Sequence, residues 1–106
     1  MPTYKVLAQV APSAATATTL LTASSATIIS TLNASNIGGT QDTIRIAVRP
    51  AGAALANQHY IAYGVPLAAG AVFSIQGGIT LANTDVVTVY STTGNTSFSA
   101  FGSDGN

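Results

Sequence analysis

Apolar and polar residues alternate with a period of two along much of this chain. In residues 43–49, every second side chain from Ile44 to Val48 is branched and aliphatic, whereas the intervening positions include Arg45 and Arg49. Such alternation places successive side chains on opposite faces of a strand, with one face turned to a core. Residues 86–90 are valine, threonine and tyrosine without any helix-favouring residue, and they give the strongest strand signal.

The other strands are expected where β-branched, aromatic and aliphatic residues lie between turn-forming residues. We expect strands over residues 4–10, 18–21, 27–34, 43–49, 59–65, 71–76, 85–91 and 96–101, with a short extended piece at 79–81. The glycine pairs at 38–39 and 77–78 are expected to be turns, and the polar residues 102–106 a loose tail. Residues 14–34 leave two interpretations open, because alanine favours helix and threonine favours strand; helix over 24–33 is the rival.

About eight short strands at spacings of about 8 to 12 residues are typical of an all-β fold, either an antiparallel β-sandwich or a jelly roll. The 106 residues fit one domain, which at this size buries roughly 60 to 70% of the surface of the unfolded chain. No linker or internal repeat divides the sequence. We therefore predict a single β-sandwich domain over residues 1–106.

Charge is scarce in this sequence. Charged residues make up 6% of the chain, against about 25% in an ordinary soluble domain. Alanine, threonine, serine, glycine and asparagine take their place, so the expected surface is neutral and rich in hydroxyl groups. A net charge near zero promotes association, and we expect sister subunits or a partner lattice to cover much of this surface.

Several kinds of partner, signal and site are not expected. Basic and acidic residues balance at three each, so no nucleic acid partner is expected. No apolar stretch approaches the length of a membrane-spanning helix, and no membrane partner is expected. The apolar run at residues 6–10 ends near Pro12 and is too short for an export signal. Without cysteine there is no disulfide framework and no cysteine-based zinc site.

The residues that could carry catalysis are few. His59 is the one histidine, and no Gly-x-Ser-x-Gly motif accompanies it, so we interpret it as a hydrogen-bonding residue at a strand end or an interface. Asp42 and Asp85 each precede a strand, where an aspartate accepts backbone N–H bonds in a turn. Glutamate is absent. We predict no enzyme, no catalytic residue, no cofactor and no metal site.

Arg45 and Arg49 are expected on the same face of one strand, just before Pro50. A solvated face needs no further explanation. However, arginine is enriched at protein interfaces, where its planar guanidinium binds carboxylates and carbonyls. Tyr60 adds an amphipathic anchor nearby. Arg45, Arg49, Tyr60 and His59 are therefore the residues that we predict at a subunit interface.

Several runs of this sequence resemble a family of small all-β virion proteins of tailed phages, cyanophages among them. The runs are residues 45–52, 59–63, 78–81, 85–90 and 98–102, within a resemblance that extends over residues 4–102. They are strand and turn patterns, and no catalytic residue is implied. The resemblance implies a β-sandwich that binds the outside of a virion, in the capsid case as a trimer over junctions between major capsid proteins.

The expected function is a capsid cement or decoration subunit, located on the capsid exterior and assembled in the host cytoplasm. Its expected partners are the major capsid protein and further copies of itself, as a homotrimer. The alternative is a tail or fibre component, such as an adhesin that binds carbohydrate. A hydrolase built on His59 is the third hypothesis, and the sequence gives it little support.

Overall fold

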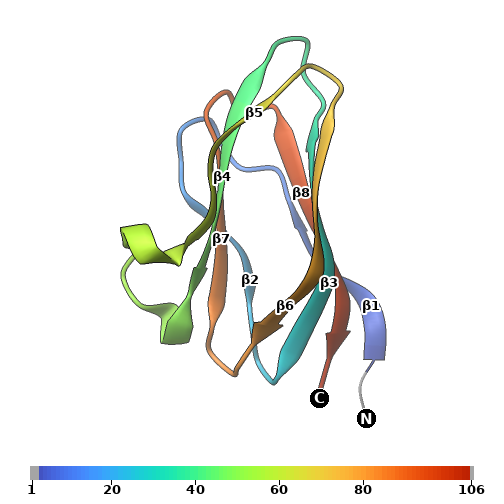
Figure 1. The fold of residues 1–106 in the computed structure, drawn as a ribbon, viewed down its shortest axis with the longest axis vertical. Coiled ribbons are helices and arrows are strands. Elements are labelled where there is room, and N and C mark those ends of the chain that lie inside the picture. The colour runs from blue at the N-terminus through green and yellow to red at the C-terminus, as the bar shows by residue number, and fades with distance from the viewer. Residues whose placement is uncertain (1–2, 106) are drawn as a thin grey trace.

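The computed structural model describes residues 3–105, which form two packed β-sheets with two 3-10 turns on one side (Figure 1). The strands are β1 (Thr3–Val10), β2 (Thr18–Thr22), β3 (Thr27–Asn36), β4 (Asp42–Arg49), β5 (Tyr60–Leu67), β6 (Val72–Leu81), β7 (Val86–Ser91) and β8 (Thr96–Asp104), and the turns are η1 (Pro50–Gly52) and η2 (Asn57–His59).

Each sheet has four antiparallel strands. Sheet A has the order β1–β8–β3–β6, and sheet B the order β2–β7–β4–β5. The strand pairs are nested, because β1 pairs with β8, β2 with β7, β3 with β6 and β4 with β5. The chain is thus a long hairpin rolled into two layers, which is the jelly-roll arrangement. The predicted all-β antiparallel sandwich or jelly roll is confirmed.

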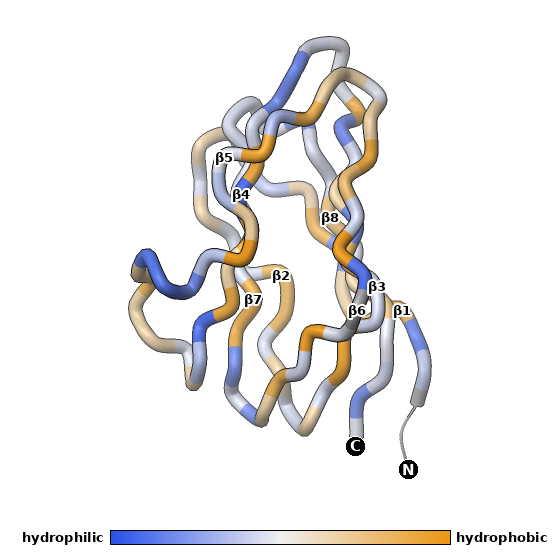
Figure 2. Tube along the Cα trace, in the orientation of Figure 1, coloured by the Kyte–Doolittle hydropathy of each residue, from blue (hydrophilic) through white to orange (hydrophobic). Residues whose placement is uncertain are grey.

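The core lies between the two sheets and follows from the period-two pattern. On β3 and β8, every second residue is buried over residues 32–36 and 96–102. Hydrophobic stretches consequently occur in both layers (Figure 2). The largest apolar side chains with less than 2% exposure are Phe98, Ile29, Leu32, Ile44, Ile46, Leu81, Val87 and Val89.

The glycine pair at residues 77–78 lies inside β6, so the predicted turn is wrong. The pairing of β3 with β6 changes register there, from Ile29 opposite Ile79 to Thr31 opposite Gln76. The extra residue makes a β-bulge, and Gly78 adopts a positive φ of +85°. The expected strand 71–76 and the short piece 79–81 are therefore one long strand.

One further expectation is wrong because β8 is longer than its pattern suggested. Residues 102–104 belong to β8 and are paired with β1 and β3, so they are no loose tail. The expected strand over residues 27–34 is confirmed, and the rival helix over 24–33 is excluded, because β3 covers Thr27–Asn36. Within residues 3–105 no helix is long and apolar enough to cross a membrane.

The orientation of side chains also differs from the expectation at two places. The apolar pattern of residues 71–76 predicts Val72 inward, but Val72 is 60% exposed, whereas Phe73 and Ile75 pack against the core. Alternation along residues 59–65 predicts His59 on the same side as Ile61 and Tyr63, yet His59 is buried and they are exposed. His59 ends the η2 turn and precedes the strand, so the alternation of β5 does not extend to it.

Candidate functional site

An arginine between two tyrosines is the main feature of the outer face of sheet B. Arg45 on β4 stands opposite Tyr63 on β5 and Tyr90 on β7. Its guanidinium carbon lies 4.5 Å from the centroid of the Tyr63 ring and 4.4 Å from that of Tyr90. Both distances fit cation–π contacts, which stabilise a partly desolvated guanidinium by about 1 to 2 kcal/mol each. The two tyrosines therefore hold Arg45 in place.

Arg45 has no polar partner among the described residues. Its Nε is buried without a hydrogen bond. The ion pair found within residues 3–105 joins Lys5 and Asp104, at 3.1 Å, and does not involve Arg45. A guanidinium normally binds carboxylates or carbonyls through its N–H edges. The positive charge on this face is therefore not neutralised by a neighbouring carboxylate.

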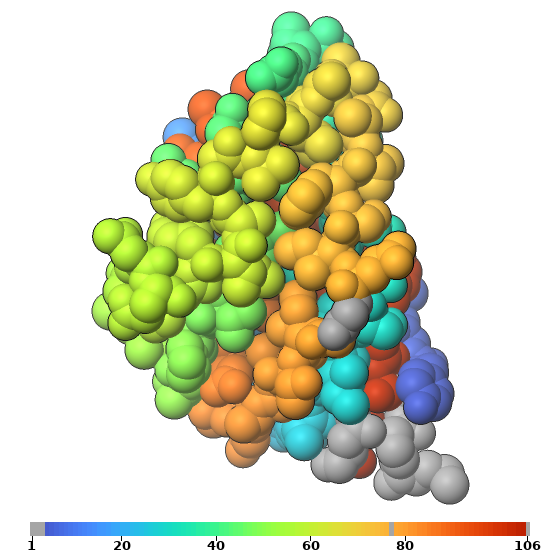
Figure 3. Space-filling model, viewed as in Figure 1, coloured from blue at the N-terminus to red at the C-terminus, as the bar shows by residue number. Residues whose placement is uncertain are grey.

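Tyr60 and Tyr63 form the walls of an open hollow beside Arg45. Their ring centroids are 4.8 Å apart, and the ring planes meet at 81°. Asn57, carried by the η2 turn, completes the lining of this hollow, whose volume is about 480 Å³. The loop of residues 50–59 stands out beside β5 in the space-filling view (Figure 3). We call Tyr60, Tyr63 and Asn57 the tyrosine hollow.

Arg49 is held by its own chain, unlike Arg45. Its Nε donates to Thr88 Oγ1 at 3.1 Å, and its Nη1 donates to the Ala53 carbonyl, also at 3.1 Å. These bonds fix the segment that follows η1 against sheet B. Arg49 therefore stabilises its own subunit, and its position is explained without a subunit interface.

His59 also bonds within its own segment. Its side chain is 9% exposed, and Nδ1 accepts the Ala56 N–H at 3.1 Å. An accepting Nδ1 leaves the proton of the neutral ring on Nε2. The histidine thus closes the η2 turn that carries Asn57. Among the described residues, no three His, Cys, Asp or Glu side chains gather where a metal ion could bind.

The structure divides the four predicted interface residues into two groups. Arg45 and Tyr60 both contact Tyr63, whereas Arg49 and His59 hold their own loop. Tyr63, Tyr90 and Asn57 also belong to the site, and their residue patterns did not predict this. Their meeting depends on strand pairing and on β-bulges between β4 and β5, for which a single sequence gives no signal.

The outer face of sheet A is a second candidate surface, and none of the described side chains that point outward from it is charged. On β3 and β6 it presents Ile28, Thr31, Asn33, Ser74 and Gln76, on rows that continue across β8 to β1. At one end, Tyr4, Val6 and Ile28 are 84%, 50% and 41% exposed. We call this surface the neutral face.

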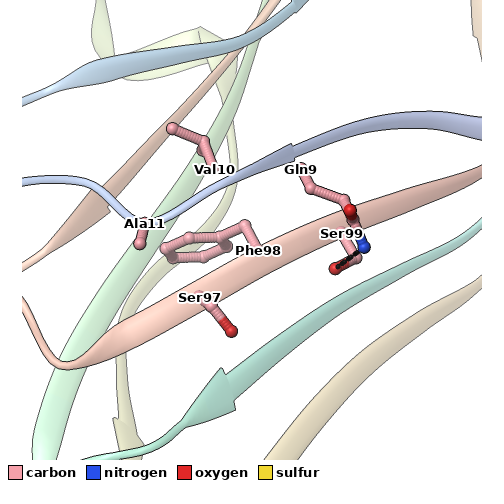
Figure 4. A pocket seen from close by; sticks show the side chains of 6 residues that line it. All are labelled: Gln9, Val10, Ala11, Ser97, Phe98 and Ser99. Carbon is pink, nitrogen blue, oxygen red and sulfur yellow. Dashed lines mark hydrogen bonds between the residues drawn. The ribbon is translucent and has the colours of Figure 1, made fainter.

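Polar side chains of the neutral face bond one another. Ser74 Oγ donates to Asn33 Oδ1 at 2.6 Å. Gln9 Nε2 donates to Ser99 Oγ at 3.4 Å, and Figure 4 shows this pair beside the Phe98 ring. A shallow hollow of about 380 Å³ lies here, along the border of β1 and β8. The face is therefore polar at this end without being charged.

Asp42 forms a buried hydrogen-bonded junction at the start of β4. Its carboxylate is 1% exposed and accepts hydrogen bonds from the Ser91 and Thr96 hydroxyls and from the Thr43 and Thr93 N–H groups. Burial raises the pKa of Asp42, but these bonds outweigh it and lower the pKa to about 2. The predicted role of Asp42 as a turn-forming acceptor of N–H bonds is confirmed.

The Asp42 junction predicts acid sensitivity. The folded pKa of about 2 lies below the ordinary aspartate value of about 3.9, so the carboxylate stabilises the fold above about pH 4 by roughly 2 kcal/mol. That stabilisation is lost as the pH falls from about 4 to 2. Urea unfolding at pH 6, 4, 3 and 2 measures it. The fall in unfolding free energy as the pH is lowered should be smaller in Asp42→Asn than in the unmodified protein. An equal fall in both proteins would contradict this role of Asp42.

Asp85 ties two turns together in the same way. It accepts the Ala51 N–H at 2.8 Å and the Ala82 N–H at 2.9 Å. These backbone bonds lower its pKa. The predicted turn-forming role of Asp85 is confirmed, and it links η1 to the turn between β6 and β7.

Comparisons with protein-family models, with curated proteins and with solved structures find no match for this chain.

Proposed function

We propose that this protein is a structural virion subunit, a capsid cement or decoration protein that docks through the neutral face of sheet A. The observation that carries the proposal is that no charged side chain points outward from this face within residues 4–105. Burying a charge requires removing its hydration shell, whereas hydroxyl and amide groups can exchange bonds with a partner. The exposed Tyr4, Val6 and Ile28 supply apolar area at one end of the face.

The distribution of charge over the molecule supports this choice of face. Arg45 and Arg49 lie on sheet B, and Asp42 is buried. Lys5 and Asp104 pair with each other at the end of β1 and β8. Double-sheet jelly rolls occur in capsid proteins and in lectins. The fold therefore supports a role in a capsid by analogy alone.

The proposed mechanism is thermodynamic. A homotrimer that binds neighbouring major capsid proteins in the assembled shell, and not the free subunits, stabilises the shell by mass action. A neutral face suits a lattice contact, because no unpaired charge is left buried when the face is covered. The trimer is the assembly that the resemblance described above implies.

A charge placed on the neutral face should prevent docking. Thr80 is exposed on β6, opposite Ile28, and Thr80→Arg should lower the occupancy of the protein on purified particles at least tenfold. The particles should also become less resistant to heat. The matched control is Thr22→Arg, an exposed threonine on β2 in sheet B. Equal occupancy of both variants, by densitometry against the major capsid protein, would contradict the proposal.

A tail or fibre component is the second candidate, and the tyrosine hollow is the observation that favours it. Exposed aromatic rings beside an amide and an arginine are typical of a recognition site. Stoichiometry in purified particles separates the two candidates. Hundreds of copies per particle support the shell, and a few copies support the tail.

A further inference from the structure

We propose that the tyrosine hollow binds a carboxylated sugar unit, such as a uronic acid within a surface polysaccharide. The hollow lies on sheet B, on the other layer from the neutral face. The inference is therefore independent of whether the protein sits on the capsid or on the tail.

The shape of the hollow fits one or two sugar rings. Its volume of about 480 Å³ falls within the range of about 300 to 1,000 Å³ that small-molecule sites occupy. Tyr60 and Tyr63 meet nearly at right angles, so they form a corner with two aromatic walls. The C–H groups of a pyranose ring carry a partial positive charge that suits the negative face of an aromatic ring.

The polar groups around the hollow are free to bind hydroxyl groups. The side chains of Tyr60, Tyr63 and Asn57 make no hydrogen bond with other described residues, and Asn57 is exposed at the rim. An asparagine amide both donates and accepts, and so does a tyrosine hydroxyl. Sugar hydroxyl groups need this mixture, whereas a purely apolar ligand would leave these groups unused.

Arg45 determines the charge of the preferred ligand. Its guanidinium lies against the Tyr63 ring, which is itself a wall of the hollow. No carboxylate neutralises it within the part of the chain that the structure describes. A positive charge against a wall of the hollow attracts an anion and does little for a neutral ligand. A sugar with a carboxylate therefore has an advantage over a neutral sugar of the same shape.

A concave site favours a saccharide over a protein side chain. Protein contacts of standard size cover about 800 Å² on each partner and are broad, whereas the hollow is lined by only three residues. Tyr63 remains 62% exposed, so its ring is available to a ligand.

The experiment compares acidic oligosaccharides with their methyl esters, which differ only in charge. Oligogalacturonate, oligoglucuronate and sialyl-lactose, each with its ester, are titrated against the purified protein by calorimetry or by ligand-observed NMR. At least one acid should bind, and its ester should bind at least tenfold more weakly. Tyr63→Ala should reduce the affinity for the acid at least tenfold. Arg45→Met should bind acid and ester alike.

Matched variants keep the outcome clear. Tyr4→Ala removes a tyrosine that is 84% exposed on the other sheet, and it should bind as the unmodified protein does. Asn57→Ala, at an exposed position, provides a second test if Tyr63→Ala does not fold. Thr80→Arg should bind sugar normally even if it no longer docks on particles. Absence of binding to all three acids, or equal affinity for acid and ester, overturns the proposal. So does a Tyr63→Ala variant that binds sugar normally but loses its place on particles.

Discussion

Replacing Asp42 by alanine is expected to lower the free energy of unfolding by about 3 to 5 kcal/mol. The carboxylate accepts bonds from two hydroxyls and two backbone N–H groups. Alanine would leave these donors in a site where Asp42 is 1% exposed, and each buried donor without a partner costs about 1 to 3 kcal/mol. A domain of this size has only about 5 to 15 kcal/mol in total, so the variant should be close to unfolding.

Chemical denaturation at pH 7 measures this loss, and Asp104→Ala is its matched control. Asp104 pairs with Lys5 in a salt bridge whose side chains are 30% and 48% exposed, and such pairs contribute about 0 to 1 kcal/mol. Asp42→Asn should lie between the two variants, because it keeps one carbonyl oxygen. Equal losses for Asp42→Ala and Asp104→Ala would show that the junction does not hold the fold.

Gly102→Ala is expected to destabilise the protein by about 3 kcal/mol or to prevent folding, since overpacking a rigid site costs about 1 to 3 kcal/mol or more. A Cβ at Gly102 would lie 2.0 Å from the Ile28 carbonyl oxygen and 3.0 Å from the Ile29 Cα. These atoms belong to the backbone of β3 and cannot rotate away. Gly102 is also paired on both sides, with Lys5 of β1 and Ile29 of β3.

The control for Gly102→Ala is the same substitution at Gly39. No atom lies within 4 Å of a Cβ built there, so Gly39→Ala should change stability by less than about 0.5 kcal/mol. Thermal melts and the yield of folded protein measure both variants. A Gly102→Ala melt close to that of the unmodified protein would show that β8 and β3 are not this close.

The sequence was sufficient for the fold class because the period-two pattern is strong on most strands. The strands over residues 42–49 and 86–91 were predicted almost to the residue, and Ile44, Ile46, Val87 and Val89 are in the core. It was insufficient where glycine was read as punctuation. Gly78 lies in a bulge, and Gly102 fills a place where only a hydrogen fits. Both glycines are required by the position of a neighbouring strand, which the local sequence pattern does not reveal.

The candidate site was predictable in part for a related reason. Because charged residues are scarce, the sequence indicated Arg45 as a candidate. In the structure Arg45 and Tyr60 both contact the ring of Tyr63. Tyr90 is 45 residues further along the sequence, and only the pairing of β4 with β7 brings it to Arg45. The sequence predicted the same interface role for Arg49 and His59 as for Arg45 and Tyr60. In the structure, however, Arg49 and His59 form hydrogen bonds with Ala53 and Ala56 of their own chain.

The position of β8 between β1 and β3 also sets the order of events during synthesis. β1 has β8 as its partner in sheet A, and Gln9 and Ser99 of these strands are 90 residues apart. At about 5 to 20 residues per second, β1 waits at least several seconds on the ribosome before its partner emerges. Such long-range pairing is slow to form. Sheet A therefore closes only after translation of β8, and until then the apolar residues of β1 depend on dilution or chaperones to stay unassociated.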